Sequence, residues 1–156
     1  MMPREHEFRS EVFWENDNSK SNSNDFLYHF QDRGNLNGSS AVPFKGNGER
    51  VSPEELFITS ISACQMLTYL HLCSKNGINV LSYRDEAKGF LSMTPGDKTF
   101  IKQIYLYPVI ICKDVQNDLQ KAIAIRLIHE AHELCFLTSS IVTEIIIEPN
   151  FVFRVL

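Results

Sequence analysis

The feature that most constrains the fold of this chain is a run of 19 residues without a charged side chain, Leu56 to Ser74. Its length is close to what a bilayer-spanning helix needs. Seven polar side chains are spread through it, however, which makes a poor lipid-facing helix and a reasonable helix buried inside a protein. The run therefore predicts the central helix of a soluble fold, with no membrane partner.

Local signals mark both ends of this helix. Ser52 is typical of an N-cap, Pro53 of the first helical position, and Glu55 completes a capping box. The pair Asn76-Gly77 predicts an end after about Lys75.

Further strands and a second helix are expected on either side of the central helix. Apolar residues at helical spacing predict the second helix over 114–134. Alternating or β-branched segments predict strands over 7–14, 26–30, 80–90, 99–111 and 142–147. The order β-β-α-β-β-α-β predicts an α+β fold. Since no linker interrupts the 156 residues, we expect a single domain over 1–156.

Composition narrows the partners and the location. The formal net charge of −4 gives no electrostatic reason to expect nucleic acid or an anionic membrane as a partner. The charged first residues have no apolar run behind them, which predicts no signal peptide and a cytoplasmic location. Four cysteines are too few for a disulfide scaffold, so free, catalytic or redox-active thiols are expected.

Two of the four cysteines have a simple structural interpretation. Cys73 lies nine residues after Cys64, which places it on the opposite side of the helix. Cys112 ends a β-branched strand. Packing is therefore expected for Cys73 and Cys112, whereas Cys64 is open to both a packing role and a reactive one.

Cys135 follows two histidines at steps of three, His129 and His132. This spacing could form the edge of a metal site, or the histidines could lie on a solvated helix face. The His129-Glu-Ala-His132 segment is one residue short of the HExxH zinc motif, which excludes that class of protease.

Two separate motifs resemble those of one protein family. Ser52 to Cys64 resembles the central-helix signature of the OsmC/Ohr family, in which a Pro-Glu-Glu/Gln-Leu opening leads to a reactive Ala-Cys. The continuation to Cys73, with Phe44-Lys-Gly46 upstream, resembles one branch of that family. Ala131-His-Glu-Leu-Cys135 resembles the second-cysteine motif of the same branch, and Glu148-Pro149 its closing strand.

The resemblance implies a fold and an activity. The fold would be OsmC-like, with antiparallel sheets and two long helices in an intertwined homodimer. The activity would be reduction of organic hydroperoxides to alcohols, with no bound cofactor or metal. Cys64 would attack the peroxide and become a sulfenic acid, and Cys135 would resolve it to a disulfide. An external dithiol would then reduce the disulfide; in the Ohr branch this reductant is a lipoylated protein.

The resemblance also implies a cation beside the reactive thiol. Only the thiolate attacks peroxide well, and a helix dipole acts within its first turn, which Cys64 lies well beyond. Glu54 matches the glutamate that orients a catalytic arginine in the family, but it lies ten residues, about 15 Å of helix, before Cys64. Arg33 is the candidate arginine, with Arg50 and Lys45 behind it.

Because the arginine has no unambiguous position, a second function stays open: a non-catalytic OsmC-like binding or stress-associated protein that keeps the fold and the cysteines.

Overall fold

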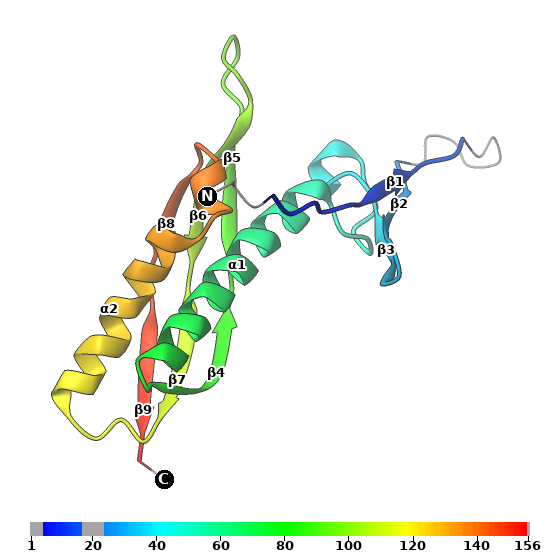
Figure 1. The fold of residues 1–156 in the computed structure, drawn as a ribbon. Coiled ribbons are helices and arrows are strands. Elements are labelled where there is room, and N and C mark those ends of the chain that lie inside the picture. The colour runs from blue at the N-terminus through cyan, green and yellow to red at the C-terminus, as the bar shows by residue number, and fades with distance from the viewer. Residues whose placement is uncertain (1–4, 17–23, 156) are drawn as a thin grey trace. The chain divides into compact units, whose positions relative to one another are not determined.

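The computed structural model describes residues 5–16 and 24–155, which form two compact units, Met1–Leu56 and Phe57–Leu156 (Figure 1). The long helix α1 (Pro53–Lys75) begins in the first unit and continues in the second. The single domain expected over 1–156 stays a prediction.

The first unit contains a three-stranded antiparallel sheet in the order β1-β2-β3. Its elements are β1 (Glu11–Phe13), β2 (Phe26–Phe30), β3 (Gly34–Gly38) and a 3-10 helix, η1 (Val42–Phe44). The tight turn between β2 and β3 is made by Asp32 and Gly34, whose φ angles of 59° and 93° lie in the left-handed region. Strand β3 was not predicted, because its Gly-Asn-Leu-Asn-Gly sequence has the composition of a loop.

The second unit contains two three-stranded sheets, in the orders β4-β7-β9 and β5-β6-β8. Their strands are β4 (Asn79–Asp85), β5 (Lys88–Ser92), β6 (Phe100–Leu106), β7 (Pro108–Lys113), β8 (Glu144–Ile147) and β9 (Asn150–Arg154). Only one or two residues separate β4 from β5, β6 from β7, and β8 from β9. Each of these three extended segments, which we call passes, therefore contributes one strand to each sheet. The predicted strands 80–90 and 99–111 are each two of these strands.

The half-buried carboxylate of Asp85 connects both sheets to helix α1, at the point where β4 ends and before β5 begins. Asp85, at the end of β4, accepts a hydrogen bond from the backbone N–H of Tyr107, which separates β6 from β7, at 2.7 Å. Its other oxygen accepts one from the Ser62 hydroxyl on α1. Glu148 donates its N–H to the Leu106 carbonyl at 2.9 Å and so joins the third pass to the second.

The α+β fold class with two long helices is confirmed, and the pairing is mixed. β4 pairs with β7, and β5 with β6, in the antiparallel sense, whereas β8 and β9 pair with β6 and β7 in the parallel sense. Parallel neighbours need a long crossover, and α2 (Asp118–Leu134) provides it between β7 and β8. The predicted helix over 114–134 begins four residues later, where the Asn117 side chain accepts from the N–H of Gln120.

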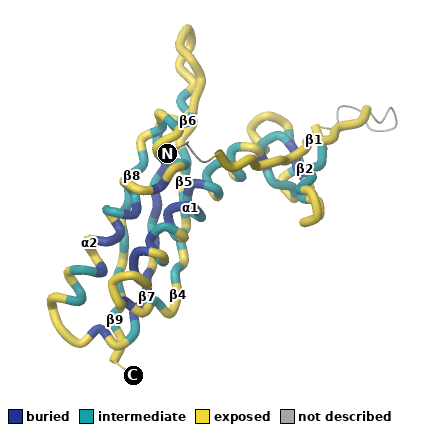
Figure 2. Tube along the Cα trace, in the orientation of Figure 1, coloured by how far each residue is buried: buried dark blue, intermediate teal, exposed yellow. Residues whose placement is uncertain are grey.

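Both helices of the second unit pack on these sheets, and the buried residues lie where they meet (Figure 2). The larger core contains residues of α1, α2, β7 and the loops beside them. A smaller core joins Ile61 of α1 to Ile104 and Leu106 of β6. Within the described residues, α1 is also the helix whose length and composition would allow it to cross a membrane.

The ends of α1 agree with the sequence signals. Ser52 donates its N–H to the Glu55 carboxylate at 2.8 Å, and the N–H of Glu55 reaches the Ser52 hydroxyl at 3.2 Å. This reciprocal pair is the predicted capping box. Gly77, with φ of 69°, follows the last turn.

Candidate active site

The structure brings Cys64 and Cys135, 71 residues apart in sequence, into direct contact. The Sγ of Cys135 donates to the Sγ of Cys64 at a distance of 2.8 Å, and both side chains are free thiols. Cys64 lies in the middle of α1, and Cys135 is the C-cap residue of α2. Cys64 is 8% exposed and Cys135 is fully buried, so the sulfur atoms meet at a nearly closed junction of the two helices.

The turn after α2 holds Cys135 in this position. The Cys135 carbonyl accepts hydrogen bonds from the Thr138 hydroxyl at 2.8 Å and from the N–H and the hydroxyl of Ser139, each at 3.1 Å. The Thr138 hydroxyl also reaches the His132 carbonyl at 3.1 Å. These bonds cap the helix end and form the short 3-10 helix η2 (Thr138–Ser140). The turn is therefore an ordered part of the site.

The environment of Cys64 contains opposing influences on its acidity. Burial raises the pKa of the Cys64 thiol above its ordinary value, and the adjacent Cys135 thiol raises it further. The backbone N–H of Leu137 and the Thr68 hydroxyl act in the other direction, because each can donate to the thiolate and so lowers the pKa. Burial dominates, and within the described residues no basic side chain contributes to the shift.

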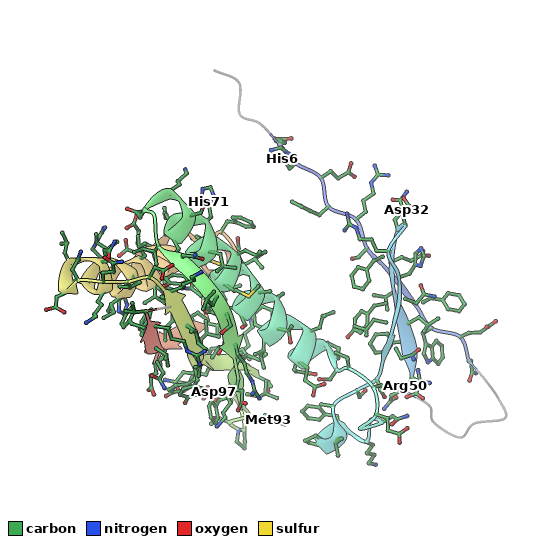
Figure 3. All side chains as sticks on the ribbon, turned by 90° about the horizontal axis from the view of Figure 1, so that it is seen from below. His6, Asp32, Arg50, His71, Met93 and Asp97 are labelled. Atoms are coloured by element: carbon green, nitrogen blue, oxygen red, sulfur yellow. The ribbon has the colours of Figure 1, made fainter. Side chains whose placement is uncertain are left out.

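Glu54 and Arg33, the other predicted site residues, belong to the first unit. Glu54 lies in the first turn of α1, and its Oε2 is buried without a hydrogen-bond partner among the described residues. Arg33 is exposed in the turn between β2 and β3, beside Asp32, which is labelled in Figure 3. Its backbone N–H donates to the Phe30 carbonyl at 2.9 Å. The roles predicted for both residues stay predictions.

The two reserve cations are also in the first unit. Arg50, labelled in Figure 3, forms an ion pair with Asp25 at 3.1 Å, and both side chains are about one-quarter exposed. Lys45 is exposed and caps η1 with a φ of 63°. Arg50 is therefore already neutralised by a carboxylate, whereas Arg33 has no ion pair among the described residues.

The remaining cysteines, Cys73 and Cys112, belong to the larger core. Both are at most 1% exposed and meet at the Tyr69 hydroxyl, which donates to the Ala124 carbonyl at 3.3 Å. Burial raises the pKa of Cys73 to about 11 and also raises that of Cys112. Thiols of this kind are poor nucleophiles at neutral pH, as packing residues are expected to be.

The metal alternative finds no support in the described part of the chain, which brings no three potential ligand side chains together. His129 is exposed on α2, whereas Cys135 is buried at the helix end. Residues at successive steps of three gradually rotate around the helix axis. His129 therefore faces solvent, whereas Cys135 faces the interior.

Three residues near the thiols were not singled out by the motifs: Thr68, Leu137 and Gln65. Thr68 and Gln65 are two of the seven polar residues in the uncharged run of this helix, and their polarity is a signal that could have indicated them. Leu137 acts through its backbone N–H, so its side-chain type carries no such signal.

This chain is similar in sequence to known proteins. The model of the OsmC-like protein family matches residues 46–150. The uncharacterised protein YmaD of Bacillus subtilis (strain 168) is 26% identical over 110 residues, which cover 69% of this chain and 73% of YmaD.

Solved structures show the same fold. An OsmC-like protein of unknown function from Vibrio cholerae O1 biovar eltor is 27% identical, with a TM-score of 0.83 over 92% of this chain and 99% of that one. An organic hydroperoxide resistance protein from Elizabethkingia anophelis is 14% identical, with a TM-score of 0.70 over 98% and 100% of the two chains. Since the family model spans well over half of the sequence, this chain belongs to the OsmC-like family.

Proposed function

We propose that this protein is a thiol-dependent peroxidase that reduces organic hydroperoxides to alcohols. The observation that carries the proposal is the 2.8 Å contact between the Sγ atoms of Cys64 and Cys135 at a nearly closed junction of two helices. Two buried thiols that touch are arranged for a reaction in which one is oxidised and the other resolves it. Membership of the OsmC-like family supports the same chemistry.

The proposed cycle has three balanced steps. The Cys64 thiolate attacks the outer peroxide oxygen, the O–O bond breaks, and the alkoxide takes a proton to leave as an alcohol. The Cys64 sulfenic acid then condenses with the Cys135 thiol, and the S–S bond forms as water is released. An external dithiol reduces the disulfide by two successive exchanges and becomes a disulfide itself. We propose a lipoylated protein as this dithiol.

The cycle needs a thiolate, and burial opposes it. The N–H of Leu137 and the Thr68 hydroxyl offset part of that effect but do not reverse it. We therefore propose that Arg33, oriented by Glu54, supplies the missing positive charge in an intertwined homodimer. The buried Glu54 oxygen, which has no partner in the part of the chain that the structure describes, supports this role because it can accept from a guanidinium.

An apolar peroxide suits the surroundings of the thiols. Leu134 and Phe136, on either side of Cys135, are 57% and 68% exposed, and Leu67 of α1 is 62% exposed. Exposed apolar side chains beside a reactive group favour an alkyl or fatty-acid hydroperoxide over hydrogen peroxide. The oxidant and the dithiol of this proposal are both expected in the cytoplasm.

One observation favours a second function. The pKa of Cys64 is raised, and no basic group of the described residues acts on it. A protein that never gains such a group would be a non-catalytic OsmC-like binding or stress-associated protein.

Consumption of cumene hydroperoxide by reduced protein, with a dithiol present, separates the two functions. The peroxidase proposal predicts multiple turnovers that are abolished in Cys64→Ser, with a lower rate for hydrogen peroxide. In Arg33→Met a fall of at least tenfold is expected, whereas Arg84→Met is the matched control, since Arg84 is an exposed arginine paired with Glu86. No peroxide loss above that of Cys64→Ser would favour the non-catalytic function.

A further inference from the structure

Besides apolar packing, three polar contacts join α1 to α2, which run side by side in opposite directions (Figure 1). One is the contact between the thiols of Cys64 and Cys135. In the second, the Nε2 of Gln65 donates to the Ile128 carbonyl at 2.9 Å. In the third, the Tyr69 hydroxyl donates to the Ala124 carbonyl at 3.3 Å. We call the two bonds to carbonyls the interhelical bonds.

The interhelical bonds fix one alignment of the helices. Gln65 and Tyr69 are four residues apart on α1, and their acceptors, Ile128 and Ala124, are four residues apart on α2. Both donors therefore lie opposite their acceptors in the same register of α1 against α2. A slide by one residue, about 1.5 Å, would break both bonds at once. Apolar contacts between helices are less selective, because side chains can repack around a small slide.

Stability alone does not account for the glutamine. Gln65 is fully buried, and its Oε1 has no hydrogen-bond partner among the described residues. Leaving a buried acceptor unpaired costs about as much as the bond to Ile128 contributes. An unbranched apolar side chain such as methionine would fill the same space without that cost. The advantage of Gln65 must therefore lie in the alignment that it selects.

Cys64 precedes Gln65 directly in α1, so the position of its sulfur relative to α2 depends on the same register. We propose that Gln65 is a positioning residue for the thiol pair: its bond to the Ile128 carbonyl holds α1 and α2 in the register that keeps the two sulfur atoms in contact. The inference rests on the Cys64–Cys135 disulfide of the proposed function. It predicts that Gln65 sets how favourably that disulfide forms.

The test is a redox titration that does not depend on peroxide turnover. Wild-type protein and Gln65→Met are equilibrated in glutathione buffers, where one oxidised glutathione becomes two reduced ones as the dithiol becomes the disulfide. Acid quenching, alkylation and peptide mass analysis then give the fraction of linked Cys64 and Cys135. We expect the equilibrium constant for disulfide formation to fall about fivefold in Gln65→Met, the effect of losing one net hydrogen bond.

A matched control separates positioning from general weakening. Ile61→Val removes one methyl group from the same helix, one turn before Gln65, in a side chain that is 1% exposed. It is expected to lower the melting temperature and to leave the redox equilibrium within twofold of wild type. Gln65→Asn provides a second variant if Gln65→Met fails to fold, because its amide is one methylene too short to reach Ile128. It should behave like Gln65→Met.

The outcomes are distinct. A change of less than twofold in the Gln65 variants, or an equal fall in Ile61→Val, would overturn the positioning role. The role would also be overturned if wild-type protein formed no Cys64–Cys135 disulfide at any ratio of oxidised to reduced glutathione. A protein that forms the disulfide with the expected dependence on Gln65, but consumes no cumene hydroperoxide, would refute only the proposed function.

Discussion

Replacing Thr68 by valine tests how far one hydrogen-bond donor offsets the effect of burial on the pKa of the Cys64 thiol. The Thr68 hydroxyl lies one turn after Cys64 on α1 and donates to the Cys64 carbonyl at 2.9 Å. It also lowers the pKa of the Cys64 thiol, because the same O–H can turn to the thiolate. Valine has the shape of threonine without the hydroxyl, so Thr68→Val removes this donor and little volume.

The size of the effect follows from two hydrogen bonds. A bond to a charged group contributes about 1.5–3 kcal/mol, and the carbonyl bond that the hydroxyl leaves contributes about 1 kcal/mol. The net loss of about 1.4 kcal/mol corresponds to about a tenfold change in the ionisation equilibrium. Since the donor favours the thiolate, its removal raises the pKa, and Cys64 should hold about tenfold less thiolate at neutral pH.

Alkylation of Cys64 by iodoacetamide across pH, followed by peptide mass analysis in a Cys135→Ser background, measures this pKa. Thr68→Val should react about tenfold more slowly at pH 7 and reach the same plateau at high pH. Thr143→Val is the matched control, because the Thr143 hydroxyl makes the same kind of bond, to the Ile101 carbonyl at 2.8 Å, and does not act on Cys64. An unchanged profile in Thr68→Val, or an equal shift in Thr143→Val, would refute the reasoning.

Three further outcomes are expected. In Cys135→Ser, the sulfenic acid on Cys64 should persist after one turnover and over-oxidise with excess peroxide, as mass analysis of the intact protein would show; a Cys64 that stays unmodified would contradict this. Cys73→Ser and Cys112→Ser should keep peroxide consumption while lowering the urea midpoint, and loss of turnover in a folded Cys73→Ser would contradict their packing role. The free energy of unfolding should fall between pH 9 and pH 11, because burial raises the pKa of Cys73 from about 9.0 to about 11 and the unfolded chain therefore loses that proton first. One such thiol lowers the free energy of unfolding by up to about 1.4 kcal/mol per pH unit in this range. Urea titrations at several pH values would show this slope in the wild type and a smaller one in Cys73→Ser.

The helices could be predicted from sequence more fully than the strands, for a physical reason. The capping box at Ser52 and the helix end at Gly77 are formed by residues adjacent in sequence, so a short sequence window is enough to predict them. Strand β3 depends on its pairing with β2, a contact that local propensity does not contain. The break between β4 and β5 depends on Asp85 and its distant partners, so the sequence showed one strand where there are two.

The site divides in the same way. Cys64 and Cys135 carry recognisable motifs, and only the fold brings their thiols together across 71 residues of sequence. Leu137 contributes a backbone N–H that every residue but proline possesses, so only the turn after α2 reveals it. Gln65 is visible as one of the polar residues in the uncharged run of α1, but its acceptor lies 63 residues away.

The contact between the two sulfur atoms also bears on what kind of signal the protein can carry. Closing a 2.8 Å contact to a covalent bond of about 2.05 Å moves each atom by well under 1 Å. A redox sensor that informs a partner through its conformation needs two distinct shapes, one for each state. A thiol pair already in contact offers almost no difference in shape to read. Oxidation at this junction is therefore suited to repeated chemical turnover, and a partner that must tell the two states apart has to react with the sulfur itself.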